Sequence, residues 1–132
     1  MKRVAHVLVG LSLLVICTGC VVAAVGAGAG AGVGTYAYIK GELQATYSTP
    51  IEQSWPKTLE AMQDLKLTID RKQMDALGGM IEARRADGTP VKVQLKPVGE
   101  YSTTIGVRVG TIGSKSKAEI IHRAIQRRIE GS

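Results

Sequence analysis

The chain has 132 residues, with one Trp, four Tyr, no Phe and a formal net charge of +6. This length allows one compact domain, and roughly the first forty residues are too apolar and too glycine-rich to belong to it. The basic residues are spread along the chain without interleaved aromatic side chains, which argues against a nucleic-acid-binding surface. Both cysteines, Cys17 and Cys20, lie in the apolar N-terminal region, which excludes a disulfide or a cysteine-based metal site from the folded domain.

Residues 1–19 have the layout of a secretory signal peptide. Lys2 and Arg3 give a charged start, an apolar stretch follows over residues 4–16, and small residues lead up to Cys20. Removal of this segment leaves 15 basic residues against 11 acids, a net charge of +4. We therefore expect an exported protein whose modest positive charge suits acidic lipids or acidic cell-wall polymers better than nucleic acid.

The residues that end at Cys20 read CTGC and resemble the lipobox of bacterial lipoproteins. The resemblance implies cleavage before Cys20, a diacylglycerol thioether on its sulfur and acylation of the new amino terminus; the thiolate is the nucleophile that this transfer needs. Cys17 departs from the usual leucine but is also apolar. Val21, and no Asp, follows Cys20, so by the same resemblance we expect an outer-membrane lipoprotein facing the periplasm. An uncleaved anchor without lipid is the alternative.

Residues 20–40 combine the lipidation site with a glycine-rich run, which has three interpretations. A tether is one, because each glycine costs about 1 kcal/mol relative to alanine in a helix in water. A membrane helix over residues 21–39 is another, in which Gly26, Gly30 and Gly34 would form a close-packing face. The third is a strand that joins the sheet through its two tyrosines, at positions 36 and 38.

The sequence of the first part of the folded domain predicts a strand followed by a helix. Apolar and polar residues alternate over residues 42–47, as in a half-buried strand. Thr49 and Glu52 then have the spacing of a capping box. Pro56 lies inside the helix, so either the helix kinks there or it starts nearer Ser54. The apolar residues expected on one face of this helix are Ile51, Trp55, Leu59, Met62 and Leu65.

Four more strands and a second helix are predicted downstream. The strands are marked by alternating apolar residues at Leu67 and Ile69, at Ile81 and Ala83, at Val91, Val93 and Leu95, and at Ile105, Val107 and Val109. Asp87 and Gly88 form a strong hairpin turn between the second and third of these strands. The last segment, to Glu130, is amphipathic and has a capping box at Ser116 and Glu119.

These elements predict one small domain over residues 41–132 with the order β-α-β-β-β-β-α. Each strand has one apolar side and each helix has one apolar face, so both helices can be buried against the same side of the sheet. The predicted fold class is α+β, an antiparallel β-sheet with two helices packed on one face.

No catalytic, cofactor or metal site is indicated. His122 is the only histidine after the signal, and because it follows the inward-facing Ile121 we interpret it as a solvated or flanking side chain. The acidic residues fall in different loops and strand ends, without the spacing of a metal site or a catalytic triad. The glycine run lacks the Gly-Lys-Ser/Thr ending of a phosphate-binding loop. We therefore expect no enzyme activity and no cofactor.

Basic side chains gather on the outward side of the predicted hairpin. The four cations are Arg84, Lys92, Lys96 and Arg108, and Glu82 is the acid expected to face them across neighbouring strands. Such a row is either a solvated sheet face or a docking surface for acidic lipid, polysaccharide or a partner protein.

Several motifs together resemble a family of small bacterial lipoproteins of unknown function. They are CTGC before the Gly/Ala run, TYAYIKGELQATY after it, and ARRADGTPVKVQL and IGVRVGTIG in the predicted sheet. The likeness covers nearly the whole chain and implies a location and a fold but no activity. More distantly, the Trp-bearing helix and the strands after it are similar to outer-membrane assembly lipoproteins, and Pro56 departs from both patterns.

Three functional hypotheses follow. The first is a non-catalytic envelope lipoprotein whose sheet face or loop edge binds an envelope protein or an acidic polymer. The second is a membrane element that oligomerises through the glycine faces of residues 21–39, with the domain as a cap. The third, a hydrolase of cell wall or lipid, has only its location in its favour. The sequence identifies neither the partner nor the oligomeric state.

Overall fold

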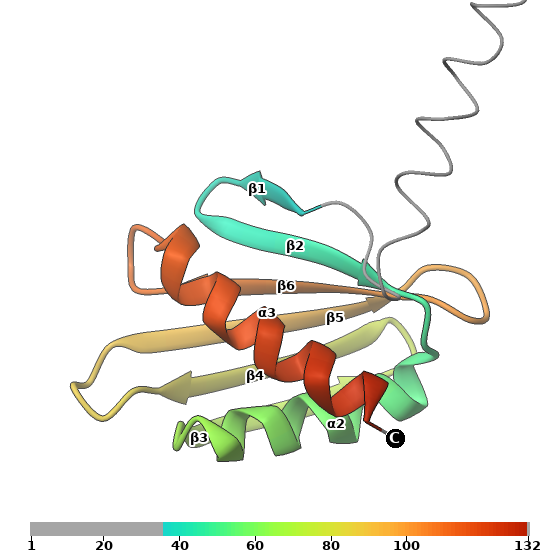
Figure 1. The fold of residues 1–132 in the computed structure, drawn as a ribbon, viewed down its shortest axis with the longest axis horizontal. Coiled ribbons are helices and arrows are strands. Elements are labelled where there is room, and N and C mark those ends of the chain that lie inside the picture. Colours follow the sequence, from blue (N-terminus) through green and yellow to red (C-terminus); the bar gives the residue numbers. More distant parts are fainter. Residues whose placement is uncertain (1–35, 132) are drawn as a thin grey trace, which may run out of the picture. The chain divides into compact units, whose positions relative to one another are not determined.

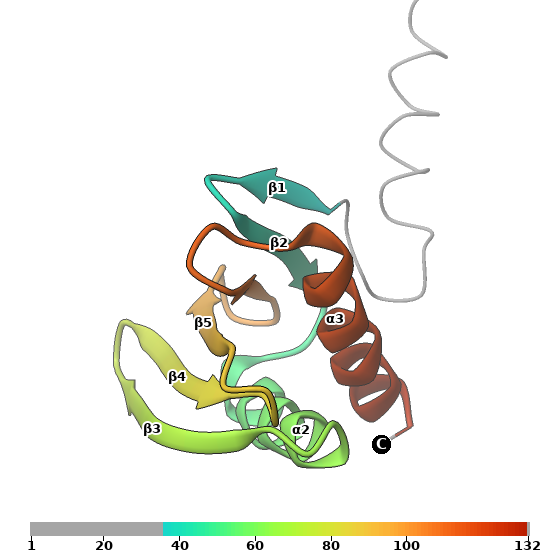
Figure 2. The same cartoon turned by 90° about the vertical axis from the view of Figure 1, so that its left-hand side faces the viewer.

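The computed structural model describes residues 36–131, so the signal, Cys20 and the glycine run lie outside the described residues. Two helices lie on one six-stranded sheet (Figures 1 and 2). The strands are β1 (Ala37–Ile39), β2 (Glu42–Tyr47), β3 (Thr68–Asp75), β4 (Gly78–Arg84), β5 (Pro90–Pro97) and β6 (Thr103–Val109). The helices are α2 (Ile51–Asp64) and α3 (Lys115–Glu130). All neighbouring strands are antiparallel, which confirms the predicted α+β class.

The strands lie in the order β1-β2-β6-β5-β4-β3. Helix α2 therefore carries the chain from β2, near one edge, to β3 at the opposite edge, and β6 returns to pair with β2. Both helices cover the same side of the sheet, as Figure 2 shows. Within residues 36–131, no helix lies on the other side.

The sheet has one strand more than predicted. Strand β1 pairs with the first half of β2 through a two-residue turn at Lys40 and Gly41, whose φ values are 50° and 83°. Two consecutive positive φ values are typical of the hairpin turn whose twist matches that of the strands. Residues 37–39 are therefore strand and precede the expected domain start at residue 41. For these three residues the structure agrees with the third interpretation, a strand that joins the sheet, although Tyr36 precedes the strand. The rest of the proposed tether over residues 20–40 and of the proposed membrane helix over residues 21–39 lies mostly outside the described part of the chain.

The core lies between the sheet and the helices. Every inward-facing strand residue from β2, β4, β5 and β6 that the alternation predicted is at most 2% exposed, which confirms that part of the pattern. These residues are Leu43, Ala45, Tyr47, Ile81, Ala83, Val91, Val93, Leu95, Ile105, Val107 and Val109.

The buried face of α2 differs from the predicted one. Trp55, Leu59 and Leu65 are only partly buried and pack at the margin of the core. The buried residues are Ile51, Ser54, Thr58, Ala61 and Met62. Helix α2 packs against α3 as well as against the sheet. The prediction is confirmed for Ile51 and Met62. It was wrong in giving Trp55, Leu59 and Leu65 fully buried positions, because it assigned the face from large apolar residues alone.

Neither predicted capping box is formed. The N-cap residues are Pro50 and Ser114, and neither accepts a hydrogen bond through its side chain. The carbonyl oxygen of Thr49 instead accepts hydrogen bonds from Thr103 Oγ1 at 2.8 Å and Ser54 Oγ at 3.2 Å. The start of α2 is therefore held to β6 by a side chain from the sheet.

Pro56 lies inside α2, which is continuous from Ile51, so a start nearer Ser54 is not observed. Proline lacks the N–H that would reach the carbonyl of Glu52 one turn earlier. In the next turn the hydroxyl of Thr58 donates to the carbonyl of Ser54 at 2.7 Å. The hydroxyl of Thr58 is thus satisfied within the helix, and that of Ser54 by the carbonyl of Thr49 just before the helix.

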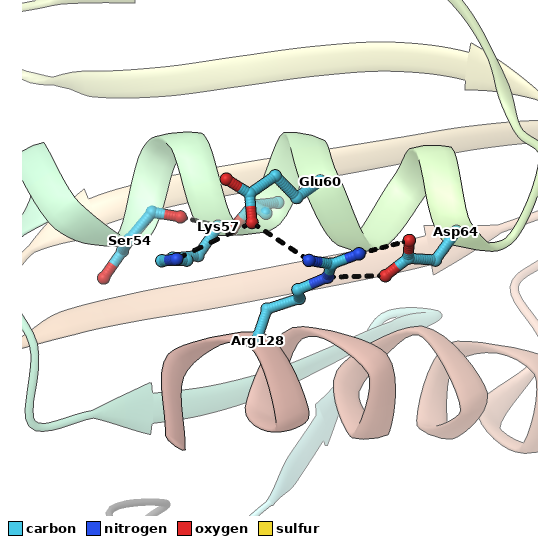
Figure 3. Close-up of polar contacts among 6 residues, drawn as sticks. Ser54, Lys57, Glu60, Asp64 and Arg128 are labelled. Atoms are coloured by element: carbon cyan, nitrogen blue, oxygen red, sulfur yellow. Dashed lines mark hydrogen bonds and ion pairs between the residues drawn. The ribbon is translucent and has the colours of Figure 1, made fainter. Parts of the chain in front are cut away.

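Charged side chains join the exposed sides of α2 and α3 (Figure 3). Arg128 on α3 donates from Nε to Asp64 at 2.6 Å and from Nη1 to Glu60 at 3.4 Å. Lys57 lies 3.6 Å from Glu60. The hydrogen bonds from Arg128 hold the pKa of Asp64 below its usual value. Because these pairs are exposed, they fix the orientation of the helices more than they contribute to stability.

We expect Gly113→Ala to destabilise the domain strongly. A Cβ at Gly113, where φ is 96°, would lie 2.3 Å from the carbonyl oxygen of Gly41, so the backbones would have to separate. At Gly88, where φ is 86°, a Cβ meets no heavy atom within 4 Å. Gly88→Ala should cost about 1 kcal/mol for the backbone conformation alone, and Gly113→Ala about 3 kcal/mol. Urea unfolding followed by Trp55 fluorescence checks this, and equal losses would contradict the close contact.

Candidate functional site

The open side of the sheet is polar. Its residues point away from both helices because they alternate with the buried ones along each strand. The outward residues of the four central strands include Glu42, Gln44, Thr46, Met80, Glu82, Lys92, Gln94, Lys96, Thr104 and Arg108. We call this surface the open face.

All four predicted cations lie on the open face. Lys92 is the direct cross-strand neighbour of Glu82 on one side and of Arg108 on the other. Lys96 lies opposite Thr104, and Arg84 lies at the end of β4. The register set by the β4–β5 hairpin therefore brings Arg84, Lys92 and Arg108 together and leaves Lys96 further along β5.

Two open depressions divide the open face. One has a volume of about 340 Å³ and is lined by Arg84, Lys92 and Arg108 together with Asp70 and Glu82. The other has a volume of about 380 Å³, and its lining includes Gln73, Met80, Gln94 and Lys96. Both are bordered by charges of both signs, because Asp75 also lines the second.

Arg84 is engaged by an acid that the sequence analysis did not assign to it. Its Nε lies 2.7 Å from Asp70 Oδ2 and its Nη2 lies 2.8 Å from Asp70 Oδ1, a two-point ion pair. This pair lowers the pKa of Asp70 and raises the pKa of Arg84. Asp70 lies on the open face because it follows Ile69, which packs against the core; the irregularity between Ile69 and Arg71 then places Arg71 opposite Glu82 on the same side. Strand alternation gives the side on which Asp70 lies but not its pairing with Arg84.

Arg108 holds two loops together. Its Nη1 donates to the carbonyl of Lys40 at 3.4 Å, and its Nη2 donates to the carbonyl of Thr111. These bonds join the β1–β2 turn to the loop between β6 and α3. Within residues 36–131, Lys92 and Lys96 form no ion pair within 4.0 Å. Of the four cations, only Arg84 is therefore paired with an acid within 4.0 Å in this range, because Arg108 bonds to neutral carbonyl groups and keeps its charge.

The interpretation of His122 as a solvated side chain is wrong. His122 is fully buried, on the face of α3 that also buries Ala118, Ile121 and Ile125. Those positions have the i, i+3, i+4, i+7 spacing of one helical face, which could have identified His122 as a core residue. Tyr36 packs edge-on against its ring with 5.4 Å between ring centroids.

Both ring nitrogens of His122 are engaged in the core. Nε2 lies 2.7 Å from the carbonyl oxygen of Leu43, which can only accept, so Nε2 carries the proton and donates. Nδ1 then accepts from the hydroxyl of Tyr47 at 2.8 Å. Burial raises the pKa of Tyr47, so the hydroxyl keeps its proton. This arrangement joins α3 to β2 and leaves neither nitrogen for a ligand from solvent.

A family model described as "Protein of unknown function (DUF3568)" matches residues 2–128. The chain belongs to this family. The match confirms membership of a family of unknown function over nearly the whole chain. No protein with a curated description matches the chain.

The described part of this DUF3568 chain has neither a group of metal-ligand side chains nor a candidate membrane-spanning helix. Among residues 36–131, no three His, Cys, Asp or Glu side chains are placed to hold a metal ion. Neither helix in that range is long and apolar enough to cross a bilayer.

We expect acid to destabilise this DUF3568 domain through His122. Burial lowers the pKa of His122 below its ordinary value of 6.5, against a smaller opposing effect of the Leu43 carbonyl. The unfolded chain therefore takes up the proton first, so stability is complete above pH 6.5 and falls as the pH drops below it. The maximum slope is about 1.4 kcal/mol per pH unit.

Urea unfolding at a series of pH values checks this slope, with His122→Gln as the control that lacks the titrating ring. The carboxylates of Asp64 and Asp70 have pKa values below 3.8, so their contribution is lost only at lower pH. An equal slope in the wild type and His122→Gln, between about pH 6.5 and pH 5, would show that another group is responsible.

Proposed function

We propose that this protein is a lipid-anchored envelope protein whose α+β domain is a non-catalytic module that binds another envelope component. In this proposal Cys20 carries the lipid, the outer membrane holds the protein on its periplasmic side, and the open face receives the partner. The observation that carries the proposal is the open face itself. Both helices cover one side of the sheet, and the other side presents two adjoining depressions lined by polar side chains.

The position of His122 supports a non-catalytic role. It is the only histidine in residues 36–131, and its ring is buried with both nitrogens bonded inside the core. General acid–base chemistry needs a group within hydrogen-bond reach of the substrate. A histidine in this position has no substrate to reach without unfolding of the domain.

The charge distribution supports a partner with acidic groups. Arg84 is neutralised by Asp70, and Glu82 lies 3.9 Å from Arg71, so the β3–β4 part of the open face is balanced. Among residues 36–131, Lys92 and Lys96 on β5 and Arg108 on β6 form no ion pair with an acid within 4.0 Å. Side-chain amides and hydroxyls around them, including those of Gln44, Gln94 and Thr104, can donate to carboxylate or sugar oxygens. A carboxylate-bearing envelope protein or an acidic polymer matches this surface.

Site-specific photocrosslinking in intact cells tests the proposal. A photoreactive residue in place of Gln94, at the centre of the open face, should give a discrete adduct of higher mass. The same residue in place of Gln63, which is exposed on α2, is the matched control and should give none. Lys92→Gln together with Lys96→Gln should reduce the adduct at position 94. No adduct at either position, or the same adduct at both, would count against the open face as the binding surface.

A further inference from the structure

One end of the sheet combines exposed apolar side chains with lysines and arginines. This end, which we call the Ile112 end, consists of residues 39–41, 65–67, 85–89 and 110–117. It lies at the left in Figure 1, which places the β1–β2 turn, the β4–β5 turn and the loop before α3 at the same end of the sheet. The amide of Gly110 donates to the carbonyl of Pro90, the residue that follows the β4–β5 turn, at 2.8 Å and so joins that turn to the loop before α3.

The apolar part of the Ile112 end projects into solvent. Ile112 is 88% exposed, the highest value among the large apolar residues from 36 to 131, and Ile39 is 51% exposed. Ile120, on the first turns of α3, is 47% exposed and borders a small crevice of about 80 Å³. Burial of an isoleucine side chain contributes about 1.5–3 kcal/mol, so exposure of two of them at one end has a considerable cost in water.

The loop that presents Ile112 is held rigidly. The backbones of Gly41 and Gly113 approach so closely that a Cβ on either glycine would lie within 2.5 Å of the opposite loop. Arg108 bonds to the carbonyls of Lys40 and Thr111 on both sides of this contact. Ile112 is therefore displayed by a fixed backbone and cannot easily turn inward to be covered by the core.

Cations surround these isoleucines. The five basic residues of the Ile112 end are Lys40, Lys66, Arg85, Lys115 and Lys117, and none of them forms an ion pair within 4.0 Å among residues 36–131. Asp87 is the single acid in the four segments that make up this end. Its pKa is lowered chiefly by hydrogen bonds from Thr89 and also by the nearby charges of Arg85 and Lys117. The net charge of the end is therefore strongly positive.

The opposite end of the sheet has a different character. It is formed by residues 75–78 and 97–102, and it also exposes apolar residues, with Leu77 at 87% and Tyr101 at 71%. Its charged residues are Asp75 and Glu100, both acidic. An anionic surface would be repelled by this end and attracted by the Ile112 end.

We propose that the Ile112 end docks onto an anionic phospholipid bilayer. Ile112 and Ile39 enter the headgroup region, and the surrounding lysines contact lipid phosphates. Apolar insertion together with cations at the rim is how peripheral segments hold to anionic membranes, and each lysine or arginine strengthens the contact about fivefold. The sheet then stands end-on to the membrane and its open face stays accessible. This docking goes beyond the proposed function and does not require a lipid on Cys20.

The test uses the full chain, purified from membranes and reconstituted into vesicles. An environment-sensitive thiol label is placed at Ile112→Cys or, as the matched control of nearly equal exposure, at Leu77→Cys. In vesicles containing phosphatidylglycerol, the label at position 112 should shift to shorter wavelength and be shielded from aqueous iodide. In phosphatidylcholine vesicles it should stay exposed, and the label at position 77 should stay exposed in both. Lys115→Gln with Lys117→Gln should lower the docked-to-free ratio about 25-fold.

An iodide-accessible label at position 112 in phosphatidylglycerol vesicles, equal shielding at positions 77 and 112, or no effect of the two lysine substitutions would overturn the inference. Labelling of the chain without an added cysteine tests the proposed lipidation separately. In a Cys17→Ser background, uptake of label means that Cys20 is a free thiol and that the lipid anchor is wrong. The difference in iodide shielding between positions 112 and 77, measured with Cys17 and Cys20 both changed to Ser, then still decides the docking.

Discussion

His122→Ala is expected to lower the free energy of unfolding by about 3–5 kcal/mol. The substitution opens a cavity beneath α3 and removes both hydrogen bonds of the ring. It leaves the carbonyl of Leu43 without this donor, and the hydroxyl of Tyr47 loses Nδ1 and keeps only the longer contact, at 3.2 Å, to the backbone carbonyl of residue 122. Since single domains have about 5–15 kcal/mol of stability, this one change should bring the protein close to unfolding.

Two further variants separate the hydrogen bonds from the packing. Tyr47→Phe removes only the donor to Nδ1 and should cost about 1–3 kcal/mol. The double variant should cost less than the sum of the two single losses, because the two side chains share one hydrogen bond. Arg123→Ala, on the exposed side of α3, is the control and should stay within about 0.5 kcal/mol of the wild type. A loss at His122 as small as that at Arg123 would contradict the buried network.

Cys20→Ala is expected to abolish incorporation of palmitate into the protein and to stop removal of the signal. Under the proposed function the sulfur of Cys20 receives the lipid, and without it the 19 preceding residues stay attached. Several acyl chains, at about 0.8 kcal/mol per buried CH₂, account for almost permanent membrane attachment, so the effect should be all or none.

The neighbouring cysteine supplies the control for this prediction. Cys17→Ala changes the residue three positions earlier and keeps the nucleophile, so palmitate labelling and cleavage should both persist. Labelled cells fractionated into inner and outer membranes provide the measurement. Normal labelling of Cys20→Ala, or loss of labelling only in Cys17→Ala, would show that the lipid is not on Cys20.

The strands were predictable where one side of the sheet is buried and the other side is exposed to solvent. Strand β5 shows the reason, because Val91, Val93 and Leu95 alternate with polar residues and a one-residue shift would bury the lysines. The edge strand β3 was recognised only at its start. Residues 71–75 are exposed on both sides and carry no alternation, so nothing in their composition marks them as strand.

Predictions failed where tertiary contacts override local patterns. Ser54 and Thr58 are buried with their hydroxyls bonded to the carbonyls of Thr49 and Ser54, and His122 is buried with its ring bonded to Leu43 and Tyr47. A helical face assigned from apolar residues alone omits such polar positions, although the spacing of Ala118, Ile121 and Ile125 places His122 on their face. The turn at Lys40 and Gly41 did carry a local signal, a glycine between two short alternating runs, that would have predicted β1.

The positions of the four cations followed from the hairpin register, but their partners did not. The turn at Asp87 and Gly88 aligns β4 with β5, which is enough to place Arg84 and Lys92 on one face. The acid that engages Arg84 comes from the neighbouring strand β3, and Arg108 bonds to carbonyls of two loops. Alternation predicts the side of the sheet on which a side chain lies, but it predicts neither the ion pairs formed there nor the path of a loop.

The lipid on Cys20 is the claim on which the cellular role depends, and the mass of the mature amino terminus tests it most directly. Intact-mass and peptide mass spectrometry of protein extracted from membranes should find Cys20 as the first residue, carrying a diacylglycerol thioether and an amide-linked acyl chain. A first residue at Met1, or a free thiol at Cys20, would contradict the proposed anchor.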